Sequence, residues 1–261
     1  MLTLNGHWQA VIYLICEVYV KFFYPLKFER EVFTLSDNGT IALDWALDCE
    51  GGFPVKNSKR PILCCISGLS GGNDSMYLAS MIRAASRGGY KCVVVNFRGT
   101  SGMKLTSPMI YWQTTWRDIQ EPIEYINDKY CGKVDAQYTK RNIYAYAVSL
   151  GSGMLAKYLV ESGEDCPLSG ALNYGTFFNV KDNVPYFKAS AWKFYDKVMG
   201  LNFYYILKDY CNQIRGTMDD DKLNQFLHNL HENRNSIMDI SENAIAPLFG
   251  YKDLDSYYRE T

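Results

Sequence analysis

The segment that most constrains the fold is residues 142–153, where an apolar run leads into a sharp turn and then a helix. It reads Asn-Ile-Tyr-Ala-Tyr-Ala-Val-Ser-Leu-Gly-Ser-Gly, with Ser149 at the turn. Small residues at Ala147 and Gly151 suit this turn, because larger side chains would collide where the backbone doubles back. A serine that only caps the following helix would give a similar local pattern. The strand before, the paired small residues and the helix after favour a nucleophile elbow, with Ser149 as the nucleophile.

Strands and helices alternate around this segment. Two short apolar runs, 62–66 and 92–97, are typical of strands buried on both faces of a sheet. Helical spacing over 75–86 lies between them and completes a β-α-β unit. The alternation continues with a helix over 116–129, a strand over 143–148, a helix over 152–161 and a strand over 168–174. The sequence therefore predicts an α/β fold with a mostly parallel sheet covered by helices on both faces.

The two ends of the chain differ from this central pattern. Residues 29–35 and 41–47 flank Asn38-Gly39, a strong hairpin signal, and should pair antiparallel at the sheet edge. From about Tyr186 onward the periodicity is helical, and no further buried strand run follows. We expect a helical cap over the carboxyl edge of the strands, where open α/β sheets bind ligands. The predicted divisions are an N-terminal helical segment over 1–27, an α/β core over 28–185 and the cap over 186–261.

An apolar stretch from Ala10 to Val20 lies within the N-terminal segment. Glu17 and Lys21 interrupt it, and it is shorter than the roughly 20 residues that a membrane span needs. No basic region precedes it, as one would in a secretory signal. We expect an amphipathic helix that packs on the domain or lies on a membrane surface.

Composition narrows the class of protein. A net charge of -1, from 27 basic and 28 acidic residues, gives no field that would attract nucleic acid. The eight cysteines form no C-x-x-C pair, and several lie in apolar runs, as reduced thiols in a core do. We therefore expect an intracellular protein without structural disulfides, bound metal or cofactor, and no nucleic-acid partner.

A glycine-rich loop, Ser67-Gly-Leu-Ser-Gly-Gly72, directly follows the 62–66 strand. Its glycines let the backbone approach a ligand closely, and Gly68 lies beside Leu69. Oxyanion holes next to a nucleophile elbow take one N–H from such a loop and one from the residue after the nucleophile. These would be the N–H groups of Leu69 and Leu150. A glycine-rich turn without a chemical role is the alternative. No P-loop lysine or G-x-G-x-x-G follows the strand, so phosphate binding is not predicted.

Motifs along the whole chain resemble those of AB-hydrolase family 4, the membrane-associated lipases and carboxylesterases and their bacterial relatives. The matching runs are Asn5-Gly6-His7-Trp8-Gln9, Asp37-Asn38-Gly39, Leu43-Asp44-Trp45, Ser67-Gly68-Leu69-Ser70-Gly71, Asn96-Phe97-Arg98-Gly99, Trp116-Arg117-Asp118-Ile119, Ser149-Leu150-Gly151 and Tyr257-Tyr258. The resemblance implies an α/β-hydrolase fold and a serine hydrolase of acyl esters, of carboxylesterase, monoacylglycerol lipase or phospholipase type. It implies an acyl-enzyme on Ser149. The acyl group then passes to water or, in a transferase, to an alcohol. We expect Asp44, Trp45, Arg98 and Asp118 to be scaffold residues.

The resemblance does not extend to the catalytic acid and base. In this fold they follow the serine in the order acid, then histidine. The family continues beyond its Tyr-Tyr region into two more strands that carry them, and this sequence ends at Thr261. His7 is too early for the base, and His228 and His231 flank an apolar stripe of a cap helix. The last strands of the sheet are therefore expected to be missing.

Two explanations of the missing strands remain open at this stage. Either the chain is incomplete, or a partner protein covers the open edge of the sheet. The first functional hypothesis is a serine ester hydrolase acting on a small lipid or ester, with peripheral membrane contact. The alternative is a hydrolase-like interaction or structural protein that lacks the acid and the base.

Overall fold

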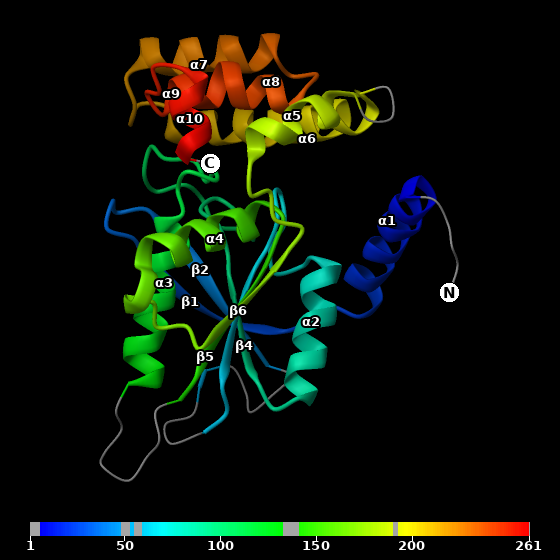
Figure 1. Cartoon of the computed structure of the whole chain (residues 1–261), viewed down its shortest axis with the longest axis vertical. Coiled ribbons are helices and arrows are strands. Elements are labelled where there is room, and N and C mark those ends of the chain that lie inside the picture. Colours follow the sequence, from blue (N-terminus) through cyan, green and yellow to red (C-terminus); the bar gives the residue numbers. More distant parts are fainter. Residues whose placement is uncertain (1–5, 48–52, 55–58, 133–140, 190–192, 261) are drawn as a thin grey trace.

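The computed structural model of the protein describes residues 6–47, 53–54, 59–132, 141–189 and 193–260 (Figure 1). Asn5 of the N-terminal motif and Cys49 lie outside the described residues. The described residues form a six-stranded sheet of strand order β1-β2-β4-β3-β5-β6. The strands are β1 (Phe28–Thr34), β2 (Thr40–Ala46), β3 (Ile62–Ile66), β4 (Lys91–Val95), β5 (Ile143–Val148) and β6 (Gly170–Tyr174).

The hairpin at one sheet edge is as predicted. β1 and β2 pair antiparallel, and Thr34 lies opposite Thr40 across the turn. Asn38 at the turn has φ +64°, a conformation that asparagine tolerates better than most residues. β2 runs antiparallel to β4, and every pairing from β4 through β6 is parallel. The predicted mostly parallel sheet is therefore confirmed.

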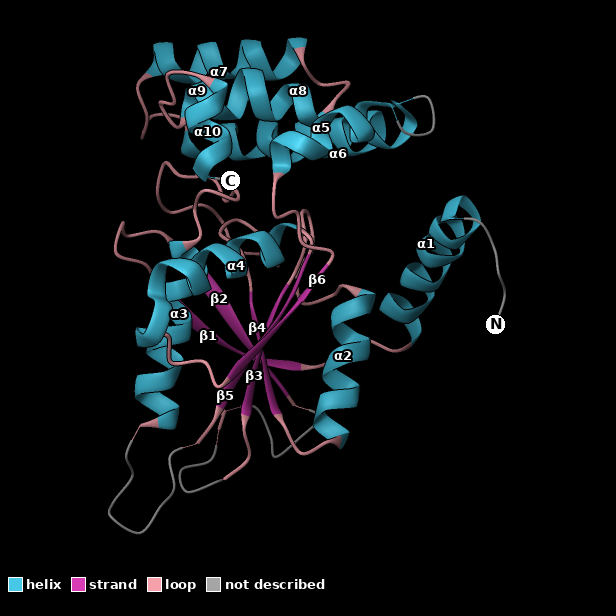
Figure 2. Ribbon diagram, in the orientation of Figure 1, coloured by secondary structure: helices cyan, strands magenta, loops and turns pink. Residues whose placement is uncertain are grey.

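Helices cover both faces of the sheet (Figure 2). α2 (Met76–Arg87) packs on one face, and α3 (Arg117–Ile126) and α4 (Leu150–Ser162) pack on the other. Two apolar clusters correspond to the two faces, because successive side chains of a strand point to opposite sides. Leu63 and Cys65 of β3 pack with the α2 side, whereas Cys64 and Ile66 pack with the α3 and α4 side. The predicted α/β fold is confirmed, and its strand order with a serine turn after β5 is that of an α/β-hydrolase fold.

Helices after β6 gather beyond the carboxyl ends of the strands (Figure 1). The segment expected to be helical from 186 onward is helical, although its first helix begins six residues earlier, at Val180. A boundary at 185/186 falls inside that helix, and the division into three domains stays a prediction. The helices are α5 (Val180–Ala189), α6 (Phe194–Ile214), α7 (Asp220–Glu232), α8 (Ile237–Ile240), α9 (Ala246–Leu248) and α10 (Leu254–Glu260), with a π-helical turn, Ser241–Ile245, between α8 and α9.

α1 (Gly6–Phe23) projects beside α2 and exposes most of its apolar side chains. The predicted helix over Ala10 to Val20 is present. Its half-buried positions are Tyr13, Glu17 and Val20, which recur at helical spacing, and the Tyr13 hydroxyl donates to Glu17. The charged residue therefore lies on the less exposed side of α1 and the apolar residues lie outside. No helix in the described ranges is both long and apolar enough to cross a membrane.

A buried ion-pair network ties the loops of the core together. Arg98, 3% exposed, donates to both carboxylate oxygens of Asp118 at 2.7 and 2.6 Å. It also donates to Asp37 at 2.7 Å and to Ser107 at 2.9 Å. Asp118 lies in the first turn of α3, as predicted. The network therefore joins the hairpin turn, the loop after β4 and the start of α3, which confirms the scaffold role expected of Arg98 and Asp118.

β6 is the other edge of the sheet and is exposed on both faces. Among the described strands it pairs only with β5. Leu172 is 54% exposed and Tyr174 is 67% exposed, and Val160 of the neighbouring α4 is 78% exposed. An edge of this kind offers unpaired backbone groups next to apolar side chains, which is the usual setting for pairing with a further strand.

Candidate active site

Ser149 occupies the turn between β5 and α4 in a strained conformation. Its φ is +52° and its ψ is −117°, a combination that few residues other than glycine adopt. The Ser149 N–H donates to the Tyr174 carbonyl at 2.9 Å, and the N–H groups of Ser152 and Gly153 donate to the Ser149 carbonyl at 3.0 and 3.1 Å. Hydrogen bonds from the end of β6 and from the first turn of α4 thus hold the strain in place.

The helix-cap alternative fits this geometry poorly. A capping serine has β-region dihedrals and accepts a backbone N–H bond with its side chain. Ser149 has a positive φ, and its side chain makes no capping bond. The strained turn instead places the hydroxyl in the cavity described below. The local conformation is therefore that of an elbow, and the role of Ser149 as nucleophile stays a prediction.

The small residues of the elbow are required by close backbone contacts. A Cβ added to Gly151 would lie 2.3 Å from the Ser67 carbonyl oxygen and 2.6 Å from Ile66 Cγ2. Ala147 is fully buried. A Cβ added to Gly68 would lie 3.2 Å from Ser149 Cβ, so the glycine-rich loop passes directly beside the serine. The structure therefore brings together Gly68, Ala147 and Gly151, as the sequence predicts.

The glycine-rich loop forms a tight turn against the elbow. The Gly71 N–H donates to the Gly68 carbonyl at 3.1 Å, which closes a four-residue turn with Leu69 at its second position. Leu69 and Leu150 both line the same cavity as Ser149. Within the part of the chain that the structure describes, we find no acceptor for either the Leu69 or the Leu150 N–H. Two free N–H groups beside a serine hydroxyl are the arrangement that stabilises an oxyanion.

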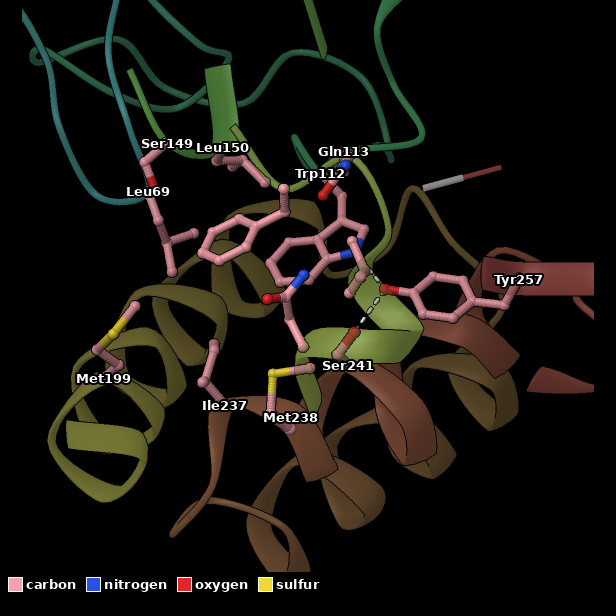
Figure 3. A pocket seen from close by; sticks show the side chains of 13 residues that line it. Leu69, Trp112, Gln113, Ser149, Leu150, Met199, Ile237, Met238, Ser241 and Tyr257 are labelled. Carbon is pink, nitrogen blue, oxygen red and sulfur yellow. Dashed lines mark hydrogen bonds between the residues drawn. The ribbon is translucent and has the colours of Figure 1, made fainter. Parts of the chain in front are cut away.

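An apolar cavity with a volume of about 270 Å³ separates the elbow from the cap. Figure 3 shows Leu69, Ser149 and Leu150 on one side and cap residues such as Met199, Met238 and Ser241 on the other. Carbon and sulfur atoms dominate its wall, so it suits a hydrocarbon group. Its lining residues are Leu69, Trp112, Gln113, Ser149, Leu150, Phe177, Val180, Asn183, Met199, Ile237, Met238, Ser241 and Tyr257.

A short hydrogen-bond chain forms the polar part of the cavity wall. Trp112 Nε1 donates to the Tyr257 hydroxyl at 2.6 Å, and the Ser241 and Tyr257 hydroxyls lie 2.5 Å apart. Burial raises the pKa of Tyr257 to about 12, so this phenol stays neutral at physiological pH. Tyr257 is the one titratable group among the described residues that line the cavity. The described residues of the cavity wall therefore include no histidine, carboxylate or lysine that could deprotonate Ser149.

The two histidines of α7 lie away from Ser149, as expected. His228 and His231 are exposed on α7, which does not line the cavity. His231 Nδ1 lies 3.2 Å from the Tyr204 hydroxyl, a contact within the cap. The side chain of His7 lies outside the described residues. Among the described residues that line the cavity, Ser149 and the glycine-rich loop therefore lie together without a histidine or carboxylate beside them.

The cap contributes cavity residues that the sequence analysis did not single out. These come from α5 and the loop before it, from α6 and from the segment that starts with α8, and Trp112 and Gln113 come from the loop before α3. No local pattern marks them, because an apolar residue that faces a cavity has the same helical spacing as one that faces the core. The one available signal was the Tyr257-Tyr258 motif, whose first tyrosine lies in the cavity wall.

Comparisons with known proteins are consistent with this architecture. No family model matches the chain. It is 34% identical over 161 residues to the embryogenesis-associated protein EMB8 of Picea glauca, a match that covers 59% of this chain and 33% of that protein. It is 25% identical over 239 residues to the phospholipase ABHD3 of Mus musculus, which covers 90% of this chain and 54% of that protein. The chain is thus similar along most of its length to an α/β-hydrolase-domain protein, but spans about half of it.

Among solved structures, the esterase Pf2001 of Pyrococcus furiosus aligns with a TM-score of 0.43 and 15% identity. The alignment covers 72% of this chain and 68% of that one.

Proposed function

We propose that this chain carries the nucleophile and the oxyanion hole of a serine hydrolase that cleaves acyl esters. The observation that carries the proposal is the strained Ser149 turn, which opens with the Leu69 and Leu150 N–H groups into one apolar cavity. The similarity to a relative named as a phospholipase supports it. Membership of AB-hydrolase family 4, and a carboxylesterase, acylglycerol lipase or phospholipase activity, are part of the proposal.

The geometry suits a two-step acyl transfer. In the first step Ser149 Oγ attacks the ester carbonyl carbon and loses its proton to a base, and the Leu69 and Leu150 N–H groups donate to the resulting oxyanion. The bond to the alcohol oxygen then breaks, and the alcohol leaves with a proton from the same base. In the second step water attacks the acyl-enzyme, the free acid is released and Ser149 regains its proton. The apolar cavity would hold the acyl chain.

The base in these steps would come from outside the described residues. We propose that a further strand pairs with β6 and brings the acid and the histidine to Ser149, from another part of the same protein or from a protein partner. Support comes from the position of β6, because the Tyr174 carbonyl at its carboxyl end accepts from the Ser149 N–H. The lack of a base in the cavity also favours a second candidate function, a hydrolase-like interaction protein that binds without turnover.

A serine-directed fluorophosphonate probe separates the two functions. We expect the probe to label the wild-type protein covalently when the strand proposed to supply the base is present, and Ser149→Ala not at all, because phosphonylation needs the activated hydroxyl. Ser152→Ala is the matched control, since Ser152 lies in the first turn of α4, its hydroxyl donates to the Ser149 carbonyl, and the variant keeps the Ser149 hydroxyl. Labelling is measured by intact-mass spectrometry. A folded wild-type protein that remains unlabelled in the presence of the strand or partner that pairs with β6 would rule out the hydrolase and leave the interaction protein.

The outward face of α1 leads us to propose peripheral contact with a lipid surface. Leu14, Ile15 and Phe22 are 60%, 64% and 74% exposed, and further apolar residues of α1 accompany them. Exposed apolar patches of this kind mark protein or membrane contacts, and an apolar helix face buries itself at the lipid boundary. An intracellular location likewise stays a prediction.

Vesicle flotation tests the lipid contact. We expect the wild-type protein to float with neutral phosphatidylcholine vesicles and the double variant Ile15→Glu/Phe22→Glu to lose at least about tenfold in partitioning, because each buried side chain contributes about 1.5–3 kcal/mol. Since the net charge is -1, raising the salt concentration should change the fraction of protein that floats only a little. Val160→Glu, which alters an equally exposed apolar site outside α1, is the control. Equal flotation of all three proteins would contradict the proposal.

A further inference from the structure

The turn that presents the Leu69 N–H is not a conformation that its sequence favours. Ser70, at the third position of the turn, has φ +61°, whereas Leu69 has a negative φ. This combination is the type II turn, which normally has glycine or asparagine at that position. A serine there costs about 1 kcal/mol or more. A turn of type I would relieve the strain by rotating the Leu69–Ser70 peptide, so something outside the turn must hold that peptide.

Two tyrosine hydroxyls hold the peptides on either side of Leu69. The Gly68 N–H donates to the Tyr77 hydroxyl at 2.9 Å, and the Ser70 N–H donates to the Tyr111 hydroxyl at 3.1 Å. Tyr77 belongs to α2 on one face of the sheet, and Tyr111 belongs to the loop between β4 and α3. The two amides that flank Leu69 are therefore occupied.

The Leu69 N–H is fixed through its own peptide group. That peptide is planar, so its carbonyl and its N–H point in opposite directions. The carbonyl is that of Gly68, which accepts from the Gly71 N–H. With this carbonyl fixed and the Gly68 and Ser70 amides bonded to tyrosines, the Leu69 N–H is the one amide of residues 68–71 that remains free to donate to a ligand at Ser149.

We propose that Tyr77 and Tyr111 are positioning residues for the oxyanion hole. The inference rests on the proposed function, because it concerns the N–H group that would hold the oxyanion of the ester reaction. Neither tyrosine would touch the substrate. Each acts through the backbone of the glycine-rich loop, and Tyr111 in particular keeps the Leu69–Ser70 peptide from rotating.

The surroundings of Tyr111 make it a rigid support. Its ring is fully buried and stacks on Phe97 after β4, with ring centroids 4.8 Å apart and planes 9° apart. Phe203 and Tyr210 of α6 pack edge-on against the same ring, at 6.4 and 6.3 Å. The position of the Ser70 amide thus depends on both the sheet and the cap.

Removal of each hydroxyl tests the proposal. We expect Tyr111→Phe and Tyr77→Phe each to lower the rate of Ser149 phosphonylation at saturating probe by about tenfold. Removing an oxyanion donor lowers a reaction rate by about 100-fold or more, and a donor that is only misplaced should lower it less. The concentration of probe at half saturation should not change, since neither hydroxyl lines the cavity. Tyr125→Phe is the control, because it removes a hydroxyl bonded to Glu31 on the outside of the core. Loss of labelling through unfolding would be seen as a change in the thermal transition.

Amide hydrogen exchange measured by NMR gives a readout that does not depend on labelling. Exchange of the Ser70 amide should become at least about tenfold faster in Tyr111→Phe and stay unchanged in Tyr77→Phe. Exchange of the Gly68 amide should become faster in Tyr77→Phe and stay unchanged in Tyr111→Phe. Unchanged exchange at both the Ser70 and the Gly68 amide would overturn the inference. Faster exchange at these amides with an unchanged rate of Ser149 labelling would also overturn it. If the wild-type protein were not labelled at all, the proposed function would fail, and unchanged exchange would overturn the tyrosine support separately.

Discussion

A methyl group at position 151 is expected to prevent the elbow from forming. The Cβ of Gly151→Ala would lie 2.3 Å from the Ser67 carbonyl oxygen, far inside van der Waals contact. The atom it meets is backbone, at the end of β3, and β3 is held by β4 and β5 on its two sides. Relief would require moving the centre of the sheet. Overpacking costs about 1–3 kcal/mol where side chains can shift, so we expect about 3 kcal/mol or more here.

Urea unfolding measures this effect, and Gly153→Ala is a matched control in the same helix. The three atoms nearest to a Cβ at Gly153 all belong to the side chain of Gln113, and the nearest is its terminal Nε2 at 2.7 Å, which can move. Alanine also favours a helix over glycine by about 0.8–1.0 kcal/mol, so the control should unfold at a similar or higher urea concentration than the wild type. An unfolding midpoint of Gly151→Ala within error of the wild type would show that α4 and β3 are not in this close contact.

The elements that could be predicted from the sequence are those specified by neighbouring residues. The hairpin follows from Asn38-Gly39, the buried strands from short apolar runs, and the Ser149 turn from the small residues on both sides of it. The structure has each of them within a few residues of the predicted bounds. The fold class and the meeting of Leu69 with Ser149 followed, because the carboxyl ends of parallel strands share one edge of the sheet.

The features that could not be predicted depend on contacts between distant parts of the chain. Tyr111 reaches the Ser70 amide across 41 positions, and the Trp112 indole reaches Tyr257 across 145. No local pattern in the sequence identifies these partners, because the two residues of each pair lie far apart along the chain. The exposed face of α1 is a second case, since an apolar helix is normally expected to turn its apolar residues inward, and here Glu17 takes the less exposed side.

Removal of the Arg98 guanidinium is expected to destabilise the core by about 3–5 kcal/mol, because it leaves a buried carboxylate without its partner. Asp118 is 5% exposed and loses both of its charged hydrogen bonds in Arg98→Met. Asp37 also loses a bond, but its side chain is 37% exposed and can be solvated. The free energy of unfolding, measured by urea titration, should show the loss. Lys157→Met removes pairs with two exposed carboxylates, Glu161 and Glu260, and should cost less than about 1 kcal/mol.

The dependence of this loss on pH identifies its cause. Burial raises the pKa of Asp118 even with Arg98 beside it, and without Arg98 the pKa should rise further. A carboxyl with a raised pKa binds its proton more tightly in the folded state, so its destabilising effect shrinks as pH falls toward that pKa. The free energy of unfolding of Arg98→Met should therefore be closer to that of the wild type at acidic pH than at pH 8. The double variant Arg98→Met/Asp118→Leu should recover part of the lost free energy. If the loss were independent of pH and the double variant were no more stable, packing of the arginine stem, and not the uncompensated charge, would be what holds these loops together.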